Sequence, residues 1–387
     1  GSLPPVIGED PAQVARLDVW LSSVALDRIT VIDTPGLASL TGASRPTEEF
    51  LALDAESRSA VSEADALLFV MSGELHQDDV AVLDAFRNLM AGTRASTVNA
   101  IGVLNKVDLI GGGAVDAVAI GQERAAKLAR VLRTSLATVV PMIGLQAETT
   151  ETGALSANHI RALTDLAAMD EMERELLLIS VDRFTTSPAP LPVPVRAELL
   201  ARLDITGVRR VVSSLAGGAD VAEALADLRT NSGLARLRTS ITELFANPAD
   251  ALKAEWGLAT LERLSERWGH RELPGRLEEV ASDPGMHAVQ ELRALQLATT
   301  EDLPLPEPFM DELRRLVTNI TLRGRLGLTS AASVSECQQA AADGSRRWAD
   351  AANSGQGGAA LRRVARVVRR SYDLMWQAAA TTQEAAV

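Results

Sequence analysis

Short apolar runs alternate with longer amphipathic stretches over the first 145 or so residues of the chain. The runs at residues 66–71, 99–105 and 138–143 have the length of buried strands. The stretches between and beyond them, about 48–62, 78–91 and 113–136, are amphipathic at the helical period. This alternation predicts a parallel sheet with helices on both faces, whose ligands bind beyond the carboxyl ends of the strands.

Two further strand patterns precede these runs. Residues 16–23 alternate between apolar and polar, as a half-exposed strand does, and residues 28–36 carry Ile29, Val31 and Ile32 into a loop. The short connection between the two segments predicts an antiparallel hairpin, with the second strand buried.

Beyond about residue 145 the strand patterns stop. The remaining sequence is predicted to be helical, with breaks rich in proline or glycine at residues 187–195, 216–220, 231–233 and 303–308. The sequence therefore predicts an α/β domain followed by an all-α region.

Composition excludes several classes of function. The chain has 387 residues and a net charge of −13, which argues against a nucleic-acid partner because phosphate backbones require excess Lys and Arg. Its single cysteine, Cys337, excludes an internal disulfide framework. No secretory signal is found, and no apolar run approaches the roughly 18 residues of a membrane span. We expect a cytoplasmic protein whose membrane contacts are peripheral.

The loop after the second strand pattern reads Asp33-Thr34-Pro35-Gly36. Asp33 at the end of a strand can hold Mg²⁺ through a water molecule. Gly36 lets its backbone N–H approach a terminal phosphate, since it has no Cβ. Without a nucleotide, the same residues would form a Pro-Gly turn with an aspartate cap.

The loop after the 99–105 run reads Asn105-Lys106-Val107-Asp108. The carboxylate of Asp108 can accept hydrogen bonds from guanine N1–H and the exocyclic amine, and adenine offers neither donor there. Asn105 can bond the base edge and tie neighbouring loops together, and the stem of Lys106 can lie over the base. A polar loop between a strand and a helix is the alternative interpretation.

The order and spacing of these two loops are those of the third and fourth motifs of the GTPase superfamily, written here DTPG and NKVD. A fifth motif should follow the next strand and contact the base through its backbone. Met142-Ile143-Gly144 stands there, so we assign Ile143 and Gly144 to the nucleotide site, although the usual Ser-Ala-Lys is lacking.

The phosphate-binding motif G-x-x-x-x-G-K-S/T is missing from the sequence, because none of its three lysines, Lys106, Lys127 and Lys253, follows a glycine. We therefore expect either a chain that lacks its N-terminal segment or a natural pseudo-GTPase, and poor nucleotide binding in both cases. Leu37 stands where Ras-like enzymes carry a water-orienting glutamine, so no catalytic residue is assigned.

Beyond the two loops, the chain resembles bacterial dynamin-like GTPases, most closely the actinobacterial isoniazid-inducible (Ini) type. The resemblance is carried by DTPGLASL, the NKVD strand and the helical segments at residues 176–184, 203–218 and 232–254. It implies an α/β GTPase (P-loop NTPase-like) domain, incomplete at its N-terminus, over residues 1–248, with a helical insertion at about 151–231. An all-α helical neck and trunk bundle over 249–387 would follow.

The resemblance also implies a function. Such proteins bind GTP or GDP with Mg²⁺, form homo- or heterodimers through the GTPase domain, and use GTP turnover to deform or fuse membranes. The expected partners are thus guanine nucleotide, a second GTPase domain and anionic membrane lipid, with no nucleic acid. Two alternatives stay open: a soluble GTPase switch, and a nucleotide-free interaction protein that pairs with an intact GTPase relative.

The last predicted helix offers a possible lipid contact. Its apolar stripe includes Leu361 and Tyr372, and its other side carries five arginines, Arg362, Arg363, Arg366, Arg369 and Arg370. A bundle helix with a solvated arginine face is the preferred interpretation. Trp256 and Trp268 could belong to a lipid-facing tip, and core anchors between helices are the preferred interpretation.

Overall fold

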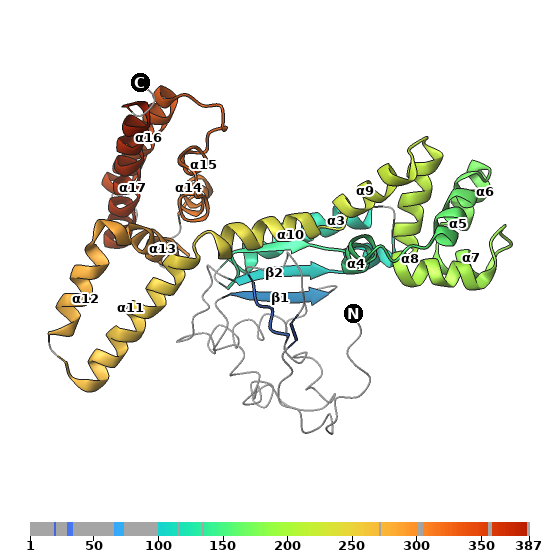
Figure 1. Cartoon of the computed structure of the whole chain (residues 1–387), viewed down its shortest axis with the longest axis horizontal. Coiled ribbons are helices and arrows are strands. Elements are labelled where there is room, and N and C mark those ends of the chain that lie inside the picture. Colours follow the sequence, from blue (N-terminus) through green and yellow to red (C-terminus); the bar gives the residue numbers. More distant parts are fainter. Residues whose placement is uncertain are drawn as a thin grey trace.

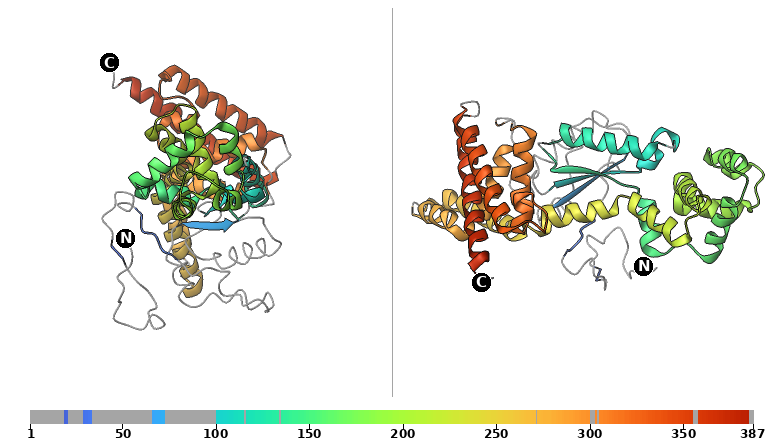
Figure 2. Two further views of the ribbon diagram at one scale, coloured as in Figure 1. Left: turned by 90° about the vertical axis from the view of Figure 1, so that its right-hand side faces the viewer. Right: turned by 90° about the horizontal axis from the view of Figure 1, so that it is seen from above.

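The computed structural model describes residues 19–20, 29–33, 66–72, 100–114, 116–133, 135–270, 272–299, 303, 305–354 and 358–384. These residues form an elongated molecule (Figure 1). A small parallel sheet lies near its middle, one group of helices lies at one end of the long axis, and a second group lies at the other. The view from above shows the same order (Figure 2).

The sheet has three parallel strands in the described part of the chain, in the order β1-β2-β3. Its strands are β1 (Leu67–Ser72), β2 (Ala100–Asn105) and β3 (Thr138–Pro141). Leu67 pairs with Ala100 and Ile101 with Thr138, so all three strands end at the same edge. The three apolar runs were therefore correctly predicted as strands of a parallel sheet.

Both faces of the sheet are covered, as the apolar runs predicted. Helix α3 (Ala117–Val131) packs on the face that carries Leu104 and Val139. Helix α10 (Leu234–Ile241) packs on the face that carries Ile101 and Val103. Side chains alternate between the two faces along β2, which explains why this central strand is apolar throughout.

The hairpin predicted before the sheet is wrong in its described part. Residues 29–33 form no strand, and Ile29, Val31 and Ile32 are exposed rather than buried. A strand needs a partner to complete its ladder, and within the described residues β1 pairs with β2 alone. The helices predicted at 48–62 and 78–91 lie outside the described residues.

The helices between β3 and α10 form their own core around Phe184, Leu199 and Val208. Four of these helices begin at a capping side chain. Ser156, Asp170, Ser180 and Asp220 each accept a backbone N–H at the start of a helix. The helices are α4 (Gly144–Thr152), α5 (Ala157–Ala167), α6 (Glu171–Leu177), α7 (Val181–Thr186), α8 (Val193–Ala216) and α9 (Val221–Asn231).

Helix α10 leads from the sheet to the second group of helices. It begins at Gly233, whose φ of 86° suits glycine and where an added Cβ would lie 2.3 Å from the carbonyl oxygen of Pro141. It ends in a π-helical turn, η6 (Thr242–Ala246), in which the N–H of Asn247 bonds the carbonyl of Thr242 at 2.9 Å. The side chain of Asn247 then donates to the carbonyl of Thr318 at 2.7 Å.

The second group is an all-α bundle, as predicted. Helices α16 and α17 lie side by side, and its largest core contains Trp348, Val364 and Tyr372. Its helices are α11 (Ala249–Trp268), α12 (Leu273–Ser282), α13 (His287–Ala298), α14 (Glu307–Thr318), α15 (Leu322–Leu326), α16 (Val334–Asn353) and α17 (Gly358–Glu384). Helix α11 begins at Ala249, and the domain boundary expected at residue 248 stays a prediction.

Candidate functional site

Asn105, the last residue of β2, joins two loops at the carboxyl edge of the sheet. Its side-chain oxygen Oδ1 accepts the backbone N–H of Lys106 at 2.8 Å and that of Gly144 at 2.9 Å. The chain turns sharply after the strand because Lys106 adopts a left-handed conformation, with φ of 58° and ψ of 35°. The strand end, the following turn and the start of α4 are thereby fixed to one another.

Asp108 lies in η5 (Val107–Gly112), the short helix that follows this turn. The residue is only 4 % exposed. Burial raises the pKa of its carboxyl group above the ordinary value, and the nearby Asp204 carboxylate raises it further. The Asp108 backbone N–H, the Thr206 hydroxyl and the Lys106 ammonium act against that rise.

The loop after β3 completes this edge of the sheet. Ile143 is buried, and its N–H donates to the carbonyl of Ser232 at 2.8 Å. An added Cβ at Gly144 would lie 3.1 Å from Oδ1 of Asn105, so a larger residue would press on the atom that links the loops. Asn105 and Gly144 are therefore matched in size as well as in hydrogen bonding.

The structure thus brings together five of the residues that the sequence assigned to nucleotide binding, Asn105, Lys106, Asp108, Ile143 and Gly144. Lys106 is exposed, while Asp108 and Ile143 are buried. A carboxylate and a side-chain amide in one place can recognise a planar, hydrogen-bonding ligand edge.

The other predicted loop is described at one residue. Asp33 is exposed, and Thr34, Pro35 and Gly36 lie outside the described residues. Within the described ranges, no cluster of three or more His, Cys, Asp or Glu side chains has the arrangement of a metal site. The assignment of Asp33 to a water-mediated Mg²⁺ stays a prediction.

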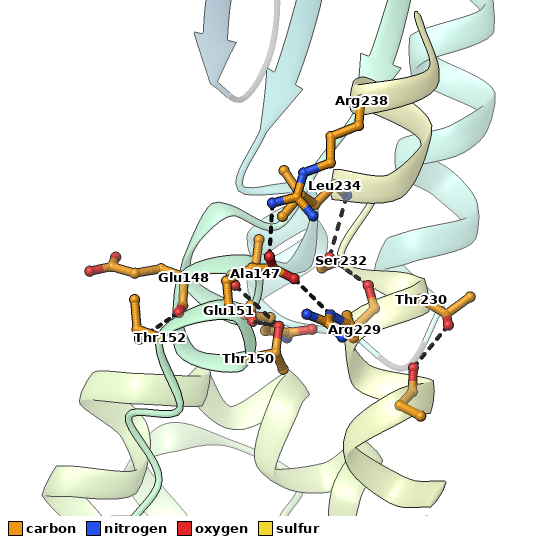
Figure 3. A network of polar contacts seen from close by, with 12 residues as sticks. Ala147, Glu148, Thr150, Glu151, Thr152, Arg229, Thr230, Ser232, Leu234 and Arg238 are labelled. Atoms are coloured by element: carbon orange, nitrogen blue, oxygen red, sulfur yellow. Dashed lines mark hydrogen bonds and ion pairs between the residues drawn. The ribbon is translucent and has the colours of Figure 1, made fainter. Parts of the chain in front are cut away.

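The far end of α4 carries an ion-pair network that the motifs did not predict (Figure 3). Glu151 accepts Nε of Arg229 at 2.7 Å and Nη2 of Arg238 at 2.8 Å, one from α9 and one from α10. Hydrogen bonds from these two arginines hold the pKa of the Glu151 carboxyl below its ordinary value. Helix α4 therefore connects the loops at the sheet edge to both α9 and α10.

Sequence reasoning also missed the contact between α8 and the Asp108 loop. Thr206 Oγ1 lies 3.5 Å from Asp108 Oδ2, and Arg209 Nη1 donates to the carbonyl of Gly113 at 3.0 Å. These partners lie about a hundred residues apart in the chain, and no local pattern links them. Polar residues within an amphipathic helix were the one available signal.

The residues considered for lipid contact differ in their exposure. The stripe of α17 that includes Leu361 and Tyr372 is buried in the bundle core and is therefore not available to lipid. The arginines on its other side are exposed. Trp268, at the end of α11, is 65 % exposed, so its prediction as a core anchor is wrong. No helix in the described ranges is both long and apolar enough to cross a bilayer.

Comparison with known proteins places the chain in a family. No family model matches it, and no solved structure matches it. The isoniazid-induced protein IniC of Mycobacterium tuberculosis, from strains CDC 1551 and H37Rv, is 32 % identical to it over 350 residues. The match covers 88 % of this chain and 69 % of IniC. The chain belongs to the IniC family.

This membership confirms the resemblance to isoniazid-inducible proteins that the sequence suggested. It extends over most of the chain, so it covers the sheet and the helical bundle alike.

Proposed function

We propose that this IniC-family protein binds and hydrolyses guanine nucleotides. The observation that supports this most directly is the single hydrogen-bond acceptor, Asn105 Oδ1, that joins the NKVD loop to the start of α4. It places Asp108 and the backbone of Ile143 and Gly144 at one edge of a parallel sheet. Such edges are the usual place of nucleotide sites.

Base recognition in this proposal depends on Asp108. An ionised carboxylate accepts hydrogen bonds from guanine N1–H and the 2-amino group at once. Adenine would leave the buried carboxylate unpaired, which costs more than an unmade bond at the surface. The exposed Lys106 supplies an aliphatic stem to lie against the base.

Asp33 is the residue that we propose for the phosphate side of the site. Asp33 is an exposed carboxylate at the end of an apolar run, which fits a water-mediated contact to Mg²⁺. A bound Mg²⁺ would neutralise phosphate charge during hydrolysis. We assign no catalytic group, because Leu37 stands where Ras-like enzymes carry the water-orienting glutamine.

The test replaces Asp108 by Asn in the natural protein and measures affinity for GDP and xanthosine diphosphate. We expect GDP affinity to fall and xanthosine diphosphate affinity to rise, because the amide NH₂ pairs with the carbonyl that xanthine carries in place of the amine. Asp116→Asn, an exposed aspartate just before α3, serves as the control and should change neither. Unchanged GDP affinity in Asp108→Asn would refute the site.

We further propose that nucleotide turnover acts on membranes, as in dynamin-like proteins, through dimers of the GTPase domain. Two features support a peripheral contact with anionic lipid: the exposed arginines of α17, and the exposed Trp268 at the turn between α11 and α12. Flotation with vesicles containing phosphatidylglycerol tests this. Binding that is equal to neutral vesicles, or unaffected by changing the α17 arginines to glutamine, would count against the arginine contact.

One observation favours a second function, that of a nucleotide-free interaction protein. Asp108 is already buried and has a hydrogen-bond partner in Thr206, so its conformation does not depend on a base. A natural protein that binds neither GDP nor xanthosine diphosphate, and that captures an intact GTPase relative, would support this alternative.

A further inference from the structure

Asp108 is held by a chain of hydrogen bonds that begins outside the NKVD loop. Gln146 Nε2, on α4, lies 3.2 Å from Thr206 Oγ1 and 3.4 Å from the carbonyl of Leu203. Thr206, on α8, lies 3.5 Å from Asp108 Oδ2. Three elements of the fold therefore meet at the carboxylate.

The direction of these bonds follows from donor and acceptor chemistry. The carbonyl of Leu203 accepts only, so the Gln146 atom that faces it must be the amide nitrogen. That nitrogen also donates to the Thr206 hydroxyl, which leaves the single hydroxyl proton free to point at Asp108. The hydroxyl is thus set as a donor to the carboxylate.

The backbone of α8 is distorted to bring Thr206 to this place. Asp204 has φ of 57° and ψ of 173°, a conformation that residues other than glycine rarely adopt. Its Oδ1 accepts the N–H of Ile205 at 2.5 Å, so it caps the helix where it resumes. Arg209, one turn further, fastens this half of α8 to the carbonyls of Gly113 and Leu178, at 3.0 and 2.8 Å.

The side chain of Gln146 is a second unusual feature of this hydrogen-bond chain. It is 1 % exposed, yet its Oε1 has no hydrogen-bond partner among the described residues. Buried acceptors are usually satisfied, and one that is not calls for an explanation. Gln146 donates to Thr206, which in turn bonds Asp108, so Gln146 lies close to the proposed base site.

We propose that Thr206 is a positioning residue for base recognition, which makes the helical insertion part of the guanine site. The proposal rests on the proposed nucleotide function. Thr206 donates to one carboxylate oxygen of Asp108, fixes its side-chain torsion, and favours the ionised form that guanine requires. Thr206 acts through Asp108 and does not itself contact the base.

The Thr206 hydroxyl acts on the ionisation of Asp108 together with the charges around that carboxylate. Burial and Asp204, from α8, oppose ionisation of Asp108, while Lys106, from the preceding turn, favours it together with Thr206. Removal of the hydroxyl therefore raises the pKa of Asp108 further. Guanine affinity should then be lost at a higher pH than in the wild-type protein.

The experiment compares Thr206→Val and Thr206→Ser in the natural protein, with Thr230→Val as the control. Thr230 is an exposed threonine of α9 whose hydroxyl bonds only within its own helix. We expect Thr206→Val to weaken GDP binding about five- to tenfold, with ADP binding unchanged. Thr206→Ser and Thr230→Val should retain wild-type affinity, and the loss of GDP affinity on acidification should begin at a higher pH in Thr206→Val alone.

Two results would overturn the proposal. Equal GDP affinity in Thr206→Val and wild type would show that the hydroxyl is dispensable, and equal losses for GDP and ADP would show a packing effect. Should Thr206→Val fail to fold, Thr206→Ala carries the same expectations. A wild-type protein that binds GDP no better than ADP would instead refute the proposed function itself, so the two failures are distinguishable.

Discussion

The side-chain oxygen of Asn105 lies 2.9 Å from the backbone nitrogen of Gly144, a residue 39 positions further along the chain. The same oxygen accepts the N–H of Lys106 at 2.8 Å. One carbonyl group therefore fixes the loop after β2 and the loop after β3 relative to each other. The geometry of the proposed base site therefore depends on this atom.

Asn105→Ala should separate loop geometry from global stability. Both N–H groups lose their acceptor, so we expect guanine-nucleotide affinity to fall by about tenfold or more, while stability falls by about 1–3 kcal/mol. Calorimetric titration with GDP checks the first expectation and thermal unfolding the second. Asn353→Ala, at an exposed position at the end of α16, is the control and should change neither.

Asp108→Asn should also change the pH dependence of stability. Because burial raises the pKa of Asp108 above its unfolded value of 3.8, the folded state binds the proton more tightly than the unfolded chain. Stability from this group is present at low pH and is lost as pH rises through the folded pKa. The neutral amide removes that loss.

The expected signature is a melting-temperature gain for Asp108→Asn at pH 7 that shrinks as pH falls toward 4. Thermal unfolding of both proteins across this range measures it. Asp116→Asn, at an exposed position, should show no such trend. A gain that is constant with pH would contradict the burial of a charged Asp108.

Glu312 should be the most sensitive polar position of the bundle. Its carboxylate accepts Trp348 Nε1 at 2.8 Å, Tyr372 Oη at 2.8 Å and Arg347 Nη2 at 2.7 Å, which ties α14 to α16 and α17. Glu312→Ala leaves the indole and phenol donors buried without an acceptor, and we expect a loss of about 2–4 kcal/mol. Glu307→Ala, whose side chain is 67 % exposed on the same helix, should cost under about 0.5 kcal/mol. Denaturant unfolding followed by tryptophan fluorescence distinguishes them.

Two helix-interior glycines should respond oppositely to alanine. In α16, a Cβ at Gly344 would lie 2.4 Å from the ring of Tyr372, which is itself buried, so we expect Gly344→Ala to destabilise by about 1–3 kcal/mol. In α11, a Cβ at Gly257 would meet nothing within 4 Å, so Gly257→Ala should stabilise by about 0.5–1 kcal/mol. Melting temperatures that shift in the same direction would contradict the close packing of α16 on Tyr372.

The sequence was informative wherever an apolar run coincided with a strand or a buried helix face. The runs that became β1, β2 and β3 were recognisable because each is short and predominantly apolar. The NKVD loop was recognisable because its residues follow β2 directly. Local pattern and tertiary structure agree at these places.

The sequence was uninformative where a side chain depends on a distant element. The distortion at Asp204 and the contact of Thr206 with Asp108 follow from docking of α8 against a loop about a hundred residues earlier. The exposure of Trp268 was mispredicted for the same reason, since the period of a helix does not say whether a partner covers a given face. The interpretation of α17 as a bundle helix was supported, because a buried core received its apolar stripe.

The two ends of α10 are constrained in different ways. At the sheet, a Cβ at Gly233 would lie 2.3 Å from the carbonyl oxygen of Pro141, so the start of the helix packs directly against the end of β3. At the bundle, Asn247 is tied to Thr318. Between these two contacts, residues 242–246 form a π-helical turn, in which the hydrogen bonds join residues five positions apart. The sheet and the bundle are thus joined by a helix that is held at both ends, and its π-helical turn lies next to the bundle.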